Sequence, residues 1–168
     1  MPEVYVAAGS NIQPRSHLRR AIGLMREAWP DLVVSHAYAN RAVGFEGEDF
    51  VNLVVGFNTE QSLQTVLDTL HRIEAACDRP RGAPRWAPRS MDLDVLLYGD
   101  AVGDFPGAVL PRPDLRRRPY MLGPLAEIAP GVVHPTAGRS VAELWKDFDA
   151  AGHELRPVEL SGEDDPCG

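Results

Sequence analysis

Two acidic residues, Asp92 and Asp94, stand one position apart in a short segment that is otherwise basic and apolar. Residues 85–96 read RWAPRSMDLDVL. On a β-strand the two carboxylates would share one face, about 6–7 Å apart, because side chains alternate with period two. Such a pair repels itself unless a cation lies between its members. Magnesium suits the pair, since it accepts one or two carboxylates together with water and phosphate oxygens.

The arginines just upstream make this pattern more specific than two acids alone. A bare D-x-D is also explained by an exposed edge strand with solvated carboxylates. Arg85 and Arg89, however, precede the acids closely enough to contact phosphates bound at the same cation. The planar guanidinium group meets phosphate oxygens in pairs, so the combined segment favours a site for a small polyanion.

Arginine is concentrated in two segments of an otherwise acidic chain. The 168 residues carry a formal net charge of -7, and of the 17 basic residues only Lys146 is lysine. The total charge argues against a general nucleic-acid binder, whereas the clusters fit a small-molecule phosphate site. Solvated surface charge is the alternative interpretation. The clustered residues are Arg72, Arg79, Arg81, Arg85 and Arg89 in the first segment, and Arg112, Arg116, Arg117 and Arg118 in the second.

Several well-known motifs are missing from the sequence. It contains no G-x-x-x-x-G-K-[ST], G-x-G-x-x-G, G-x-S-x-G or H-E-x-x-H, which excludes a P-loop and leaves a dinucleotide-binding fold without support. The five histidines never pair at metal-ligand spacing, and two cysteines are too few for a disulfide framework or a four-thiolate zinc site. No apolar run approaches the length of a membrane helix, and the N-terminus lacks the layout of a signal peptide. We therefore expect a cytoplasmic protein.

Hydrophobic periodicity and turn residues divide residues 1–160 into the elements of a single domain. We expect Ser16 and Ser62 to cap the first two helices. Loops are expected at residues 39–49, 78–90 and 104–119, and a disordered acidic tail at residues 161–168. The predicted strands are residues 4–8, 32–38, 50–57 and 95–98, and the predicted helices are residues 18–29, 63–73, 120–128 and 140–148.

The order of these elements favours an α+β fold. It predicts a ferredoxin-like α/β sandwich, with a largely antiparallel sheet and the helices packed on one face. A doubly wound α/β fold would need alternating βα units. No helix separates the strands at residues 32–38 and 50–57, so that alternative lacks support. The chemistry is then expected in the long loops at one end of the sheet.

At the D-x-D segment the sequence resembles the 6-hydroxymethyl-7,8-dihydropterin pyrophosphokinase family of folate biosynthesis. The resemblance extends from about residue 3 to residue 145, and five blocks occur in order. They are Gly9-Ser10-Asn11, Phe50-Val51-Asn52, Arg72-Ile73-Glu74, residues 85–96, and residues 120–130, which read YMLGPLAEIAP.

The resemblance implies transfer of the β,γ-pyrophosphoryl group of ATP, a co-substrate, to the hydroxymethyl oxygen of the dihydropterin, with AMP as the other product. It implies two Mg²⁺ ions on Asp92 and Asp94, and it places Arg79 and Arg89 beside these acids as catalytic residues. The nucleotide-binding residues that it implies are Glu74, Arg81, Arg85, Trp86, Arg112 and Arg118.

The resemblance also implies how the pterin is held. Phe50 and Tyr120 match the two aromatic rings that hold the pterin between them, Asn52 matches the amide that contacts its polar edge, and Val43 lies in the loop beside it. ATP and the hydroxymethyl-dihydropterin are then the expected partners. We expect a monomer that binds neither nucleic acid nor membrane.

Two departures from the family pattern keep other hypotheses open. Arg112 stands where the family usually has a histidine, and the loop at residues 39–48 departs from the usual Tyr-x-Thr-x-Pro. Because that loop borders the pterin, a second hypothesis is the same chemistry on a different hydroxymethyl heterocycle. A third, motivated by Arg112, is a non-catalytic relative that binds nucleotide or pterin.

Overall fold

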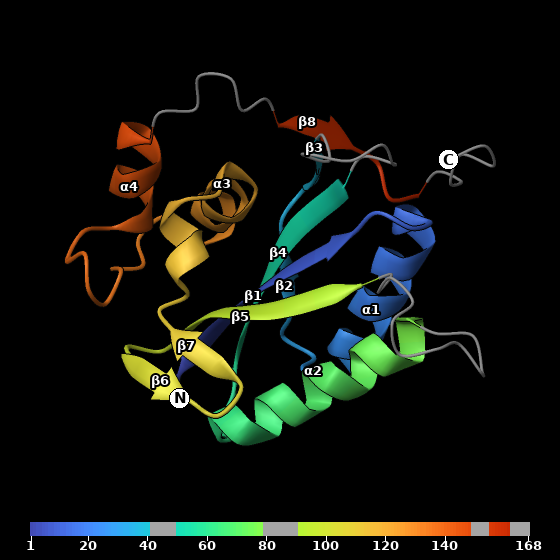
Figure 1. Cartoon of the computed structure of the whole chain (residues 1–168), viewed down its shortest axis with the longest axis horizontal. Helices are drawn as coiled ribbons and strands as arrows, with labels where there is room; N and C mark the ends of the chain where they lie inside the picture. The colour runs from blue at the N-terminus through green and yellow to red at the C-terminus, as the bar shows by residue number, and fades with distance from the viewer. Residues whose placement is uncertain (41–49, 79–90, 149–154, 162–168) are drawn as a thin grey trace.

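The computed structural model describes residues 1–40, 50–78, 91–148 and 155–161, which form a sheet with helices on both of its faces (Figure 1). The larger elements surround the site described below. The strands are β1 (Glu3–Ser10), β2 (Val33–Val34), β3 (Ala37–Asn40), β4 (Phe50–Asn58), β5 (Asp92–Tyr98), β6 (Gly103–Phe105), β7 (Ala108–Leu110) and β8 (Arg156–Val158). The helices are α1 (Pro14–Ala28), α2 (Leu63–Asp78), α3 (Pro119–Ile128) and α4 (Val141–Asp147), with a 3-10 turn at Pro113–Arg116.

The main sheet has the strand order β5-β1-β4-β3-β8, and β2 pairs with β4 beside β3. Every pairing in it is antiparallel. The strands β1 and β5, which are far apart in sequence, are neighbours because α1 and α2 each carry the chain across one face of the sheet. The predicted ferredoxin-like α+β fold is confirmed.

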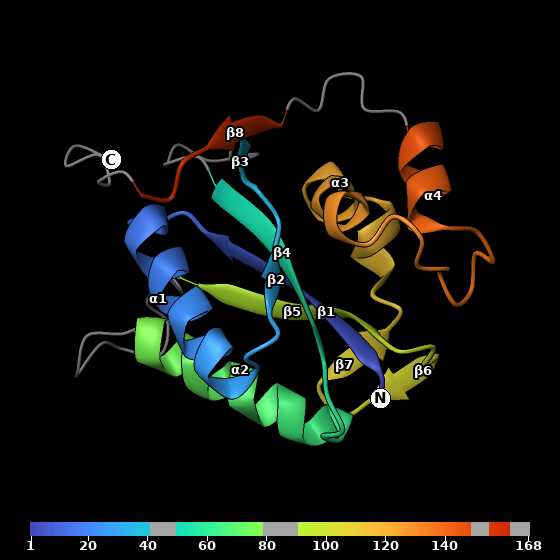
Figure 2. The same ribbon diagram turned by 180° about the vertical axis from the view of Figure 1, so that it is seen from behind.

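The helices cover both faces of the sheet, which corrects the expectation of a single covered face (Figure 2). Leu18, Met25 and Leu70 of α1 and α2 belong to one core, and Leu122 and Leu144 of α3 and α4 belong to the other. The central strand β4 is buried on both faces, so its second apolar face must also be covered. None of the helices in the described ranges has the length and apolarity needed to cross a bilayer.

The predicted strand at residues 32–38 is divided by a bulge. Val34 pairs with Val55 and Tyr38 pairs with Asn52, so three residues lie opposite two. The Ser35 hydroxyl fills the irregular position by accepting a hydrogen bond from the backbone N–H of Val54 at 2.9 Å. The alternation of apolar residues in the sequence does not reveal where a hydroxyl takes the place of a backbone hydrogen-bond partner, so the bulge could not be predicted.

Two further expectations fail in the described residues, and both concern short-range geometry. Helix α1 begins at Pro14, whose fixed φ suits the first helical position, so Ser16 lies inside the helix and does not cap it. The expected loop at residues 104–119 instead contains the β6–β7 hairpin and the 3-10 turn. The Ser62 cap is confirmed, because its hydroxyl accepts a hydrogen bond from the Thr65 N–H at 3.2 Å.

Candidate active site

Three neighbouring strands place the predicted polar residues in one row on the α3 face of the sheet. Gly9 of β1 lies opposite Asn52 of β4 on one side and opposite Asp92 of β5 on the other. Ala7 lies opposite Asp94 in the same way. Leu93, between the two acids, belongs to the core under α1 and α2, so the acids face the opposite side. Both acids thus lie on a strand, because β5 begins at Asp92, three residues before the predicted strand at residues 95–98.

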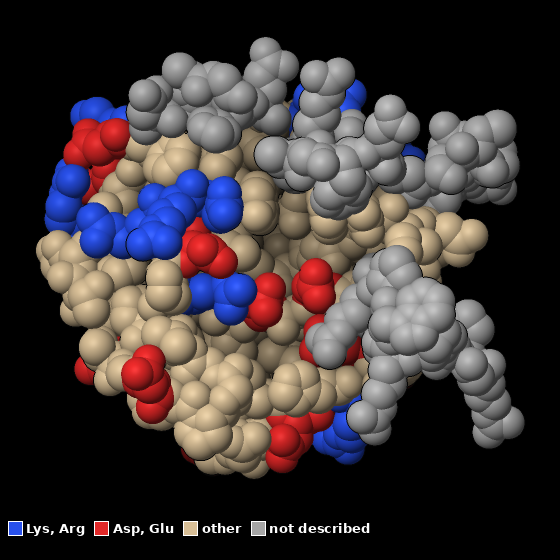
Figure 3. Space-filling model, viewed as in Figure 1, with Lys and Arg blue, Asp and Glu red and all other residues tan. Residues whose placement is uncertain are grey.

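A cavity of about 250 Å³ lies above this row, between the sheet, the start of α3 and the 3-10 turn. Figure 3 shows a hollow on this side of the molecule, with acidic side chains at its rim and basic side chains beside them. The predicted residues that line the cavity are Phe50, Asn52, Asp92, Asp94, Arg112 and Tyr120. Six residues that are scattered over 71 positions of sequence thus meet at one site.

Arg112 bridges two carboxylates at the wall of this cavity. One of its terminal nitrogens lies 3.6 Å from Asp94 Oδ1, and the other lies 3.6 Å from Asp114 Oδ2. Charge-assisted hydrogen bonds are usually about 2.7–2.9 Å long, so these contacts are mainly electrostatic. The Asp94 side chain is 36% exposed. Its carboxylate therefore stays accessible to a cation from the cavity.

The carboxylate pair fits magnesium better than a metal held wholly by protein. Within the described ranges, no group of three or more His, Cys, Asp or Glu side chains is placed to hold an ion. Magnesium usually keeps several water molecules and takes only one or two carboxylates plus substrate phosphates. Asp92 and Asp94 supply two such oxygen donors in an open cavity, and Asp114 adds negative charge nearby. The donor set is therefore compatible with Mg²⁺ bound together with a phosphate substrate.

The two predicted aromatic residues reach the cavity from different elements. Phe50 begins β4 and Tyr120 is the second residue of α3, and both side chains are half-buried. Asn52 lies two positions after Phe50 and so projects to the same face of the sheet. Its side chain is only 8% exposed, and its amide can both donate and accept hydrogen bonds. A flat heterocycle with a polar edge matches this combination of rings and amide.

Helix α3, which carries Tyr120, is fixed to the sheet at its other end by Glu127. One carboxylate oxygen of Glu127 accepts a hydrogen bond from the Tyr38 hydroxyl at 2.6 Å. The other accepts from the His36 backbone N–H and contacts His36 Nδ1, each at 2.8 Å. Burial raises the pKa of Glu127, but these hydrogen bonds outweigh it and hold the pKa below its usual value. Burial and the bond to Glu127 raise the pKa of Tyr38 to about 12.

Two predicted nucleotide-binding residues lie in the described part of the chain but outside this cavity. Glu74 of α2 lies beside β5, where its Oε2 accepts a hydrogen bond from the Leu93 backbone N–H at 3.3 Å. Arg118, just before α3, is exposed at the surface. The remaining predicted residues lie outside the described ranges: Val43, Arg79, Arg81, Arg85, Trp86 and Arg89.

Of the five cavity residues that were not predicted as site residues, Gly9 and Asp114 contact predicted ones. Gly9 belongs to one of the sequence blocks, and a Cβ at this position would stand 2.5 Å from Asn52 Oδ1. Glycine is therefore needed there for the amide to lie over β1. Asp114 was missed because its partner is Arg112, at the start of a turn that was expected to be loop. A single sequence contains no signal for either, since both depend on contacts across elements.

Comparisons with known proteins identify the family of the chain. The family model described as 7,8-dihydro-6-hydroxymethylpterin-pyrophosphokinase (HPPK) matches residues 5–130. A protein of Pseudomonas aeruginosa named 2-amino-4-hydroxy-6-hydroxymethyldihydropteridine pyrophosphokinase is 36% identical over 159 residues, which cover 92% of this chain and 96% of that protein. A protein of Synechocystis with the same name is 36% identical over 131 residues, covering 77% of this chain and 67% of that protein.

The fold also matches solved structures. A crystal structure of an HPPK-DHPS in complex with substrates aligns with a TM-score of 0.66 and 11% identity, over 90% of this chain and 44% of that chain. The chain thus spans less than half of that longer protein, and the likeness supports the fold alone. The family match covers the strands and the helix that line the cavity, from β1 to the end of α3. The chain belongs to the 7,8-dihydro-6-hydroxymethylpterin-pyrophosphokinase family.

Proposed function

We propose that this chain transfers the β,γ-pyrophosphoryl group of ATP to the hydroxymethyl group of 6-hydroxymethyl-7,8-dihydropterin, and that it does so in the cavity described above. The proposal rests on one observation, namely that a carboxylate pair and two aromatic side chains line the same cavity. Asp92 and Asp94 line the same cavity as Phe50, Asn52 and Tyr120. A phosphate donor and a flat acceptor can therefore be held side by side.

The acceptor is assigned to the ring side of the cavity. Phe50 and Tyr120 would contact the two faces of the pterin, which desolvates it at a low entropy cost because each ring has few rotatable bonds. Asn52 would donate to and accept from the pterin's polar edge. Val43 belongs to the adjoining loop by resemblance, and we assign it to the same pocket.

The donor is assigned to the acidic side. Asp92 and Asp94 would hold two magnesium ions, which when bound would neutralise phosphate charge and favour the ionised form of the acceptor hydroxyl. Arg79 and Arg89, which match catalytic-loop arginines of the family, are assigned to the transferred phosphates. Glu74, Arg81, Arg85, Trp86, Arg112 and Arg118 complete the proposed nucleotide site.

The reaction itself needs mostly alignment. The hydroxymethyl oxygen forms a bond to the β-phosphorus and loses its proton, while the bond from that phosphorus to the oxygen that bridges to the α-phosphate breaks. AMP leaves with the bridging oxygen. The chain's contribution is to hold the two reactants in line and to place positive charge beside the phosphates. Arg112 supplies such a charge at the wall shared by the two sides of the cavity.

A discontinuous assay of AMP formation tests the proposal. Wild-type protein with Mg²⁺, ATP and 6-hydroxymethyl-7,8-dihydropterin should produce AMP and the pterin diphosphate in equal amounts. Asp94→Asn should lower kcat/KM at least about a thousandfold, or about 4 kcal/mol in transition-state stabilisation. Asp100→Asn, which removes an exposed carboxylate just beyond the other end of β5, is the matched control and should keep wild-type turnover.

The same assay separates the proposal from its alternatives. AMP formation with another hydroxymethyl heterocycle but not with the dihydropterin would assign a different acceptor. Tight binding of nucleotide and pterin without AMP formation would identify a non-catalytic relative. We further expect a monomer in the cytoplasm, and sedimentation of the pure protein tests the first of these expectations.

A further inference from the structure

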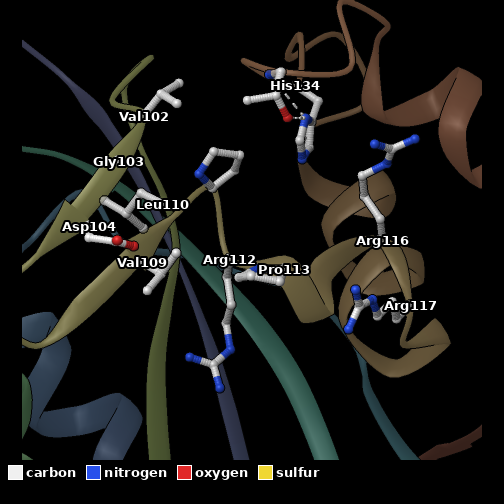
Figure 4. Close-up of a pocket in the computed structure, with 12 residues that line it drawn as sticks. Val102, Gly103, Asp104, Val109, Leu110, Arg112, Pro113, Arg116, Arg117 and His134 are labelled. Atoms are coloured by element: carbon white, nitrogen blue, oxygen red, sulfur yellow. Dashed lines mark hydrogen bonds between the residues drawn. The ribbon is translucent and has the colours of Figure 1, made fainter.

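A second cavity, of about 590 Å³, lies on the other side of Arg112 (Figure 4). It is an open cavity bordered by the β6–β7 hairpin, the 3-10 turn and the loop that follows α3. Val102, Val109 and Pro111 form an apolar wall. The polar groups are contributed mainly by residues that the proposed reaction does not use: Arg116, Arg117 and His134.

His134 presents an unsatisfied hydrogen-bond donor to this cavity. The residue is 2% exposed, and its Nδ1 accepts hydrogen bonds from the backbone N–H groups of Thr136, at 3.3 Å, and Ala137, at 3.0 Å. With Nδ1 as acceptor, the proton of the neutral ring resides on Nε2. Nε2 is buried and finds no hydrogen-bond partner among the described residues. Buried donors without acceptors are rare, so an acceptor is expected from outside the described residues, such as a bound anion.

The surroundings of His134 keep this donor in place. The Thr136 and Ala137 contacts fix the ring orientation, and Figure 4 shows the ring directed toward the space beside Arg116. Burial and the positive charge of Arg116 lower the pKa of His134. The ring is therefore neutral at neutral pH and donates from Nε2 alone.

The same cavity carries positive charge that is not neutralised locally. Arg116 and Arg117 are both exposed, and no carboxylate of the described ranges lies within ion-pair distance of either. The carboxylate that borders the cavity, Asp104, belongs to β6 on the hairpin wall. Figure 3 shows basic side chains gathered beside the hollow on this face. The cavity thus combines two exposed cations, one neutral donor of fixed orientation and an apolar wall.

We propose that this cavity is a second binding site, which takes a small oxyanion, a phosphate monoester or a carboxylate, carried on an apolar group. Arg116 and Arg117 pair with the oxyanion, His134 Nε2 donates a hydrogen bond to one of its oxygens, and the apolar group lies against Val109 and Pro111. The site is separate from the proposed active site because Asp92, Asp94, Phe50 and Tyr120 do not line it. Arg112 lines both cavities and forms the wall between them.

Titration of the full chain with three probes, in the absence of magnesium and ATP, tests this site. Inorganic phosphate, phenyl phosphate and benzoate are added while the amide signals of Thr136 and Ala137 and the His134 ring nitrogens are followed by NMR. We expect saturable shifts, with phenyl phosphate bound more tightly than inorganic phosphate because its ring reaches the apolar wall. Benzoate tests whether a carboxylate suffices in place of a phosphate.

Variants assign the binding to the named side chains. Arg116→Gln should weaken phenyl phosphate about tenfold or more, which corresponds to about 1.4 kcal/mol. His134→Asn should weaken it too, since asparagine Oδ1 can still accept from Thr136 and Ala137 but Nε2 is lost. Arg139→Gln removes a charge from the same loop outside the cavity, where Arg139 pairs with Glu143 and Asp147, and should leave the affinity unchanged.

The outcomes distinguish this site from the proposed active site. Unchanged phenyl phosphate binding in Asp94→Asn supports a separate site, even if that variant proves inactive. No saturable shift with any of the three probes would overturn the proposal, as would equal affinity in wild type and Arg116→Gln. Displacement of phenyl phosphate by a magnesium–nucleotide complex, one for one, would assign the cavity to the nucleotide and also overturn it.

Discussion

Gly9 determines where the Asn52 amide lies, although it has no side chain of its own. It lies between Asn52 and Asp92 in the strand register, and the space above it is occupied by the amide. The carboxylate pair could be predicted from the sequence because a period of two is a local property of a strand. The requirement for glycine at position 9 could not be predicted from the sequence, because the atom that would clash with a Cβ there, Asn52 Oδ1, belongs to the neighbouring strand.

Substitution of this glycine should impair acceptor binding specifically. In Gly9→Ala the new Cβ would stand 2.5 Å from Asn52 Oδ1, so the amide must move. We expect KM for the pterin to rise about tenfold or more, while KM for ATP changes little. The cost to the free energy of unfolding should be about 1–3 kcal/mol, as is usual for overpacking.

A second glycine provides the matched control for this substitution. Gly23 lies within α1, and no atom stands within 4 Å of a Cβ built there. Gly23→Ala should stabilise the fold by up to about 1 kcal/mol and leave both KM values unchanged, because alanine has the higher helix propensity. Equal KM effects at both positions would argue against the role given to Asn52.

Helix α3 is the element that joins the acceptor side of the site to the sheet. Its first turn carries Tyr120, and its last turn carries Glu127, which is bonded to Tyr38 and His36. The helix could be predicted from its apolar spacing. The bulge at Ser35 could not be predicted, because the alternation of apolar residues does not reveal a hydroxyl that replaces a backbone partner. The β6–β7 hairpin could not be predicted either, because strands of three residues are too short to show a period.

Removal of the Glu127 charge should loosen this attachment. Glu127→Gln keeps the shape but weakens the hydrogen bonds from Tyr38 and His36, so we expect a loss of about 1–2 kcal/mol in the free energy of unfolding at pH 7. The folded-state pKa of Glu127 is lowered, so its stabilisation is present above about pH 4.5 and is lost as pH falls through the folded-state pKa. Chemical denaturation of both proteins from pH 7 to pH 3 measures this difference.

The control for this prediction is an exposed glutamate. Glu143 pairs with Arg139 at 3.3 Å, and its side chain is 59% exposed. Glu143→Gln should cost less than about 1 kcal/mol, since surface ion pairs contribute little. A difference in the free energy of unfolding between wild type and Glu127→Gln that stays constant down to pH 3 would contradict the assigned role of the Glu127 carboxylate.

At the scale of the whole molecule, one sheet separates two cores, and the proposed active site opens on the face that α3 only partly covers. The ferredoxin-like order of strands and helices was predictable because the long helices have a clear apolar period and turn residues separate the longer strands. The second core was missed because β4 is apolar at nearly every position, so that its two faces cannot be told apart by alternation. Residues 41–49 and 79–90 lie outside the described ranges.

Ligand binding should stabilise the whole fold through the two carboxylates. An ATP analogue with a methylene group between the α- and β-phosphates, added with Mg²⁺ at about 100 times its Kd, should raise the free energy of unfolding by about 2.7 kcal/mol. For a domain of this size that corresponds to a rise in Tm of about 5–10 °C. Asp92→Asn combined with Asp94→Asn should abolish the rise but leave the Tm without ligand close to that of wild type.

A crystal structure of the complex with Mg²⁺, the α,β-methylene analogue of ATP and 6-hydroxymethyl-7,8-dihydropterin tests the central claim most directly. We expect carboxylate oxygens of both Asp92 and Asp94 at about 2.1 Å from magnesium, with the pterin ring between Phe50 and Tyr120. We also expect the hydroxymethyl oxygen to face the β-phosphorus. Magnesium and phosphates bound away from these two carboxylates, or a pterin outside the two rings, would contradict it.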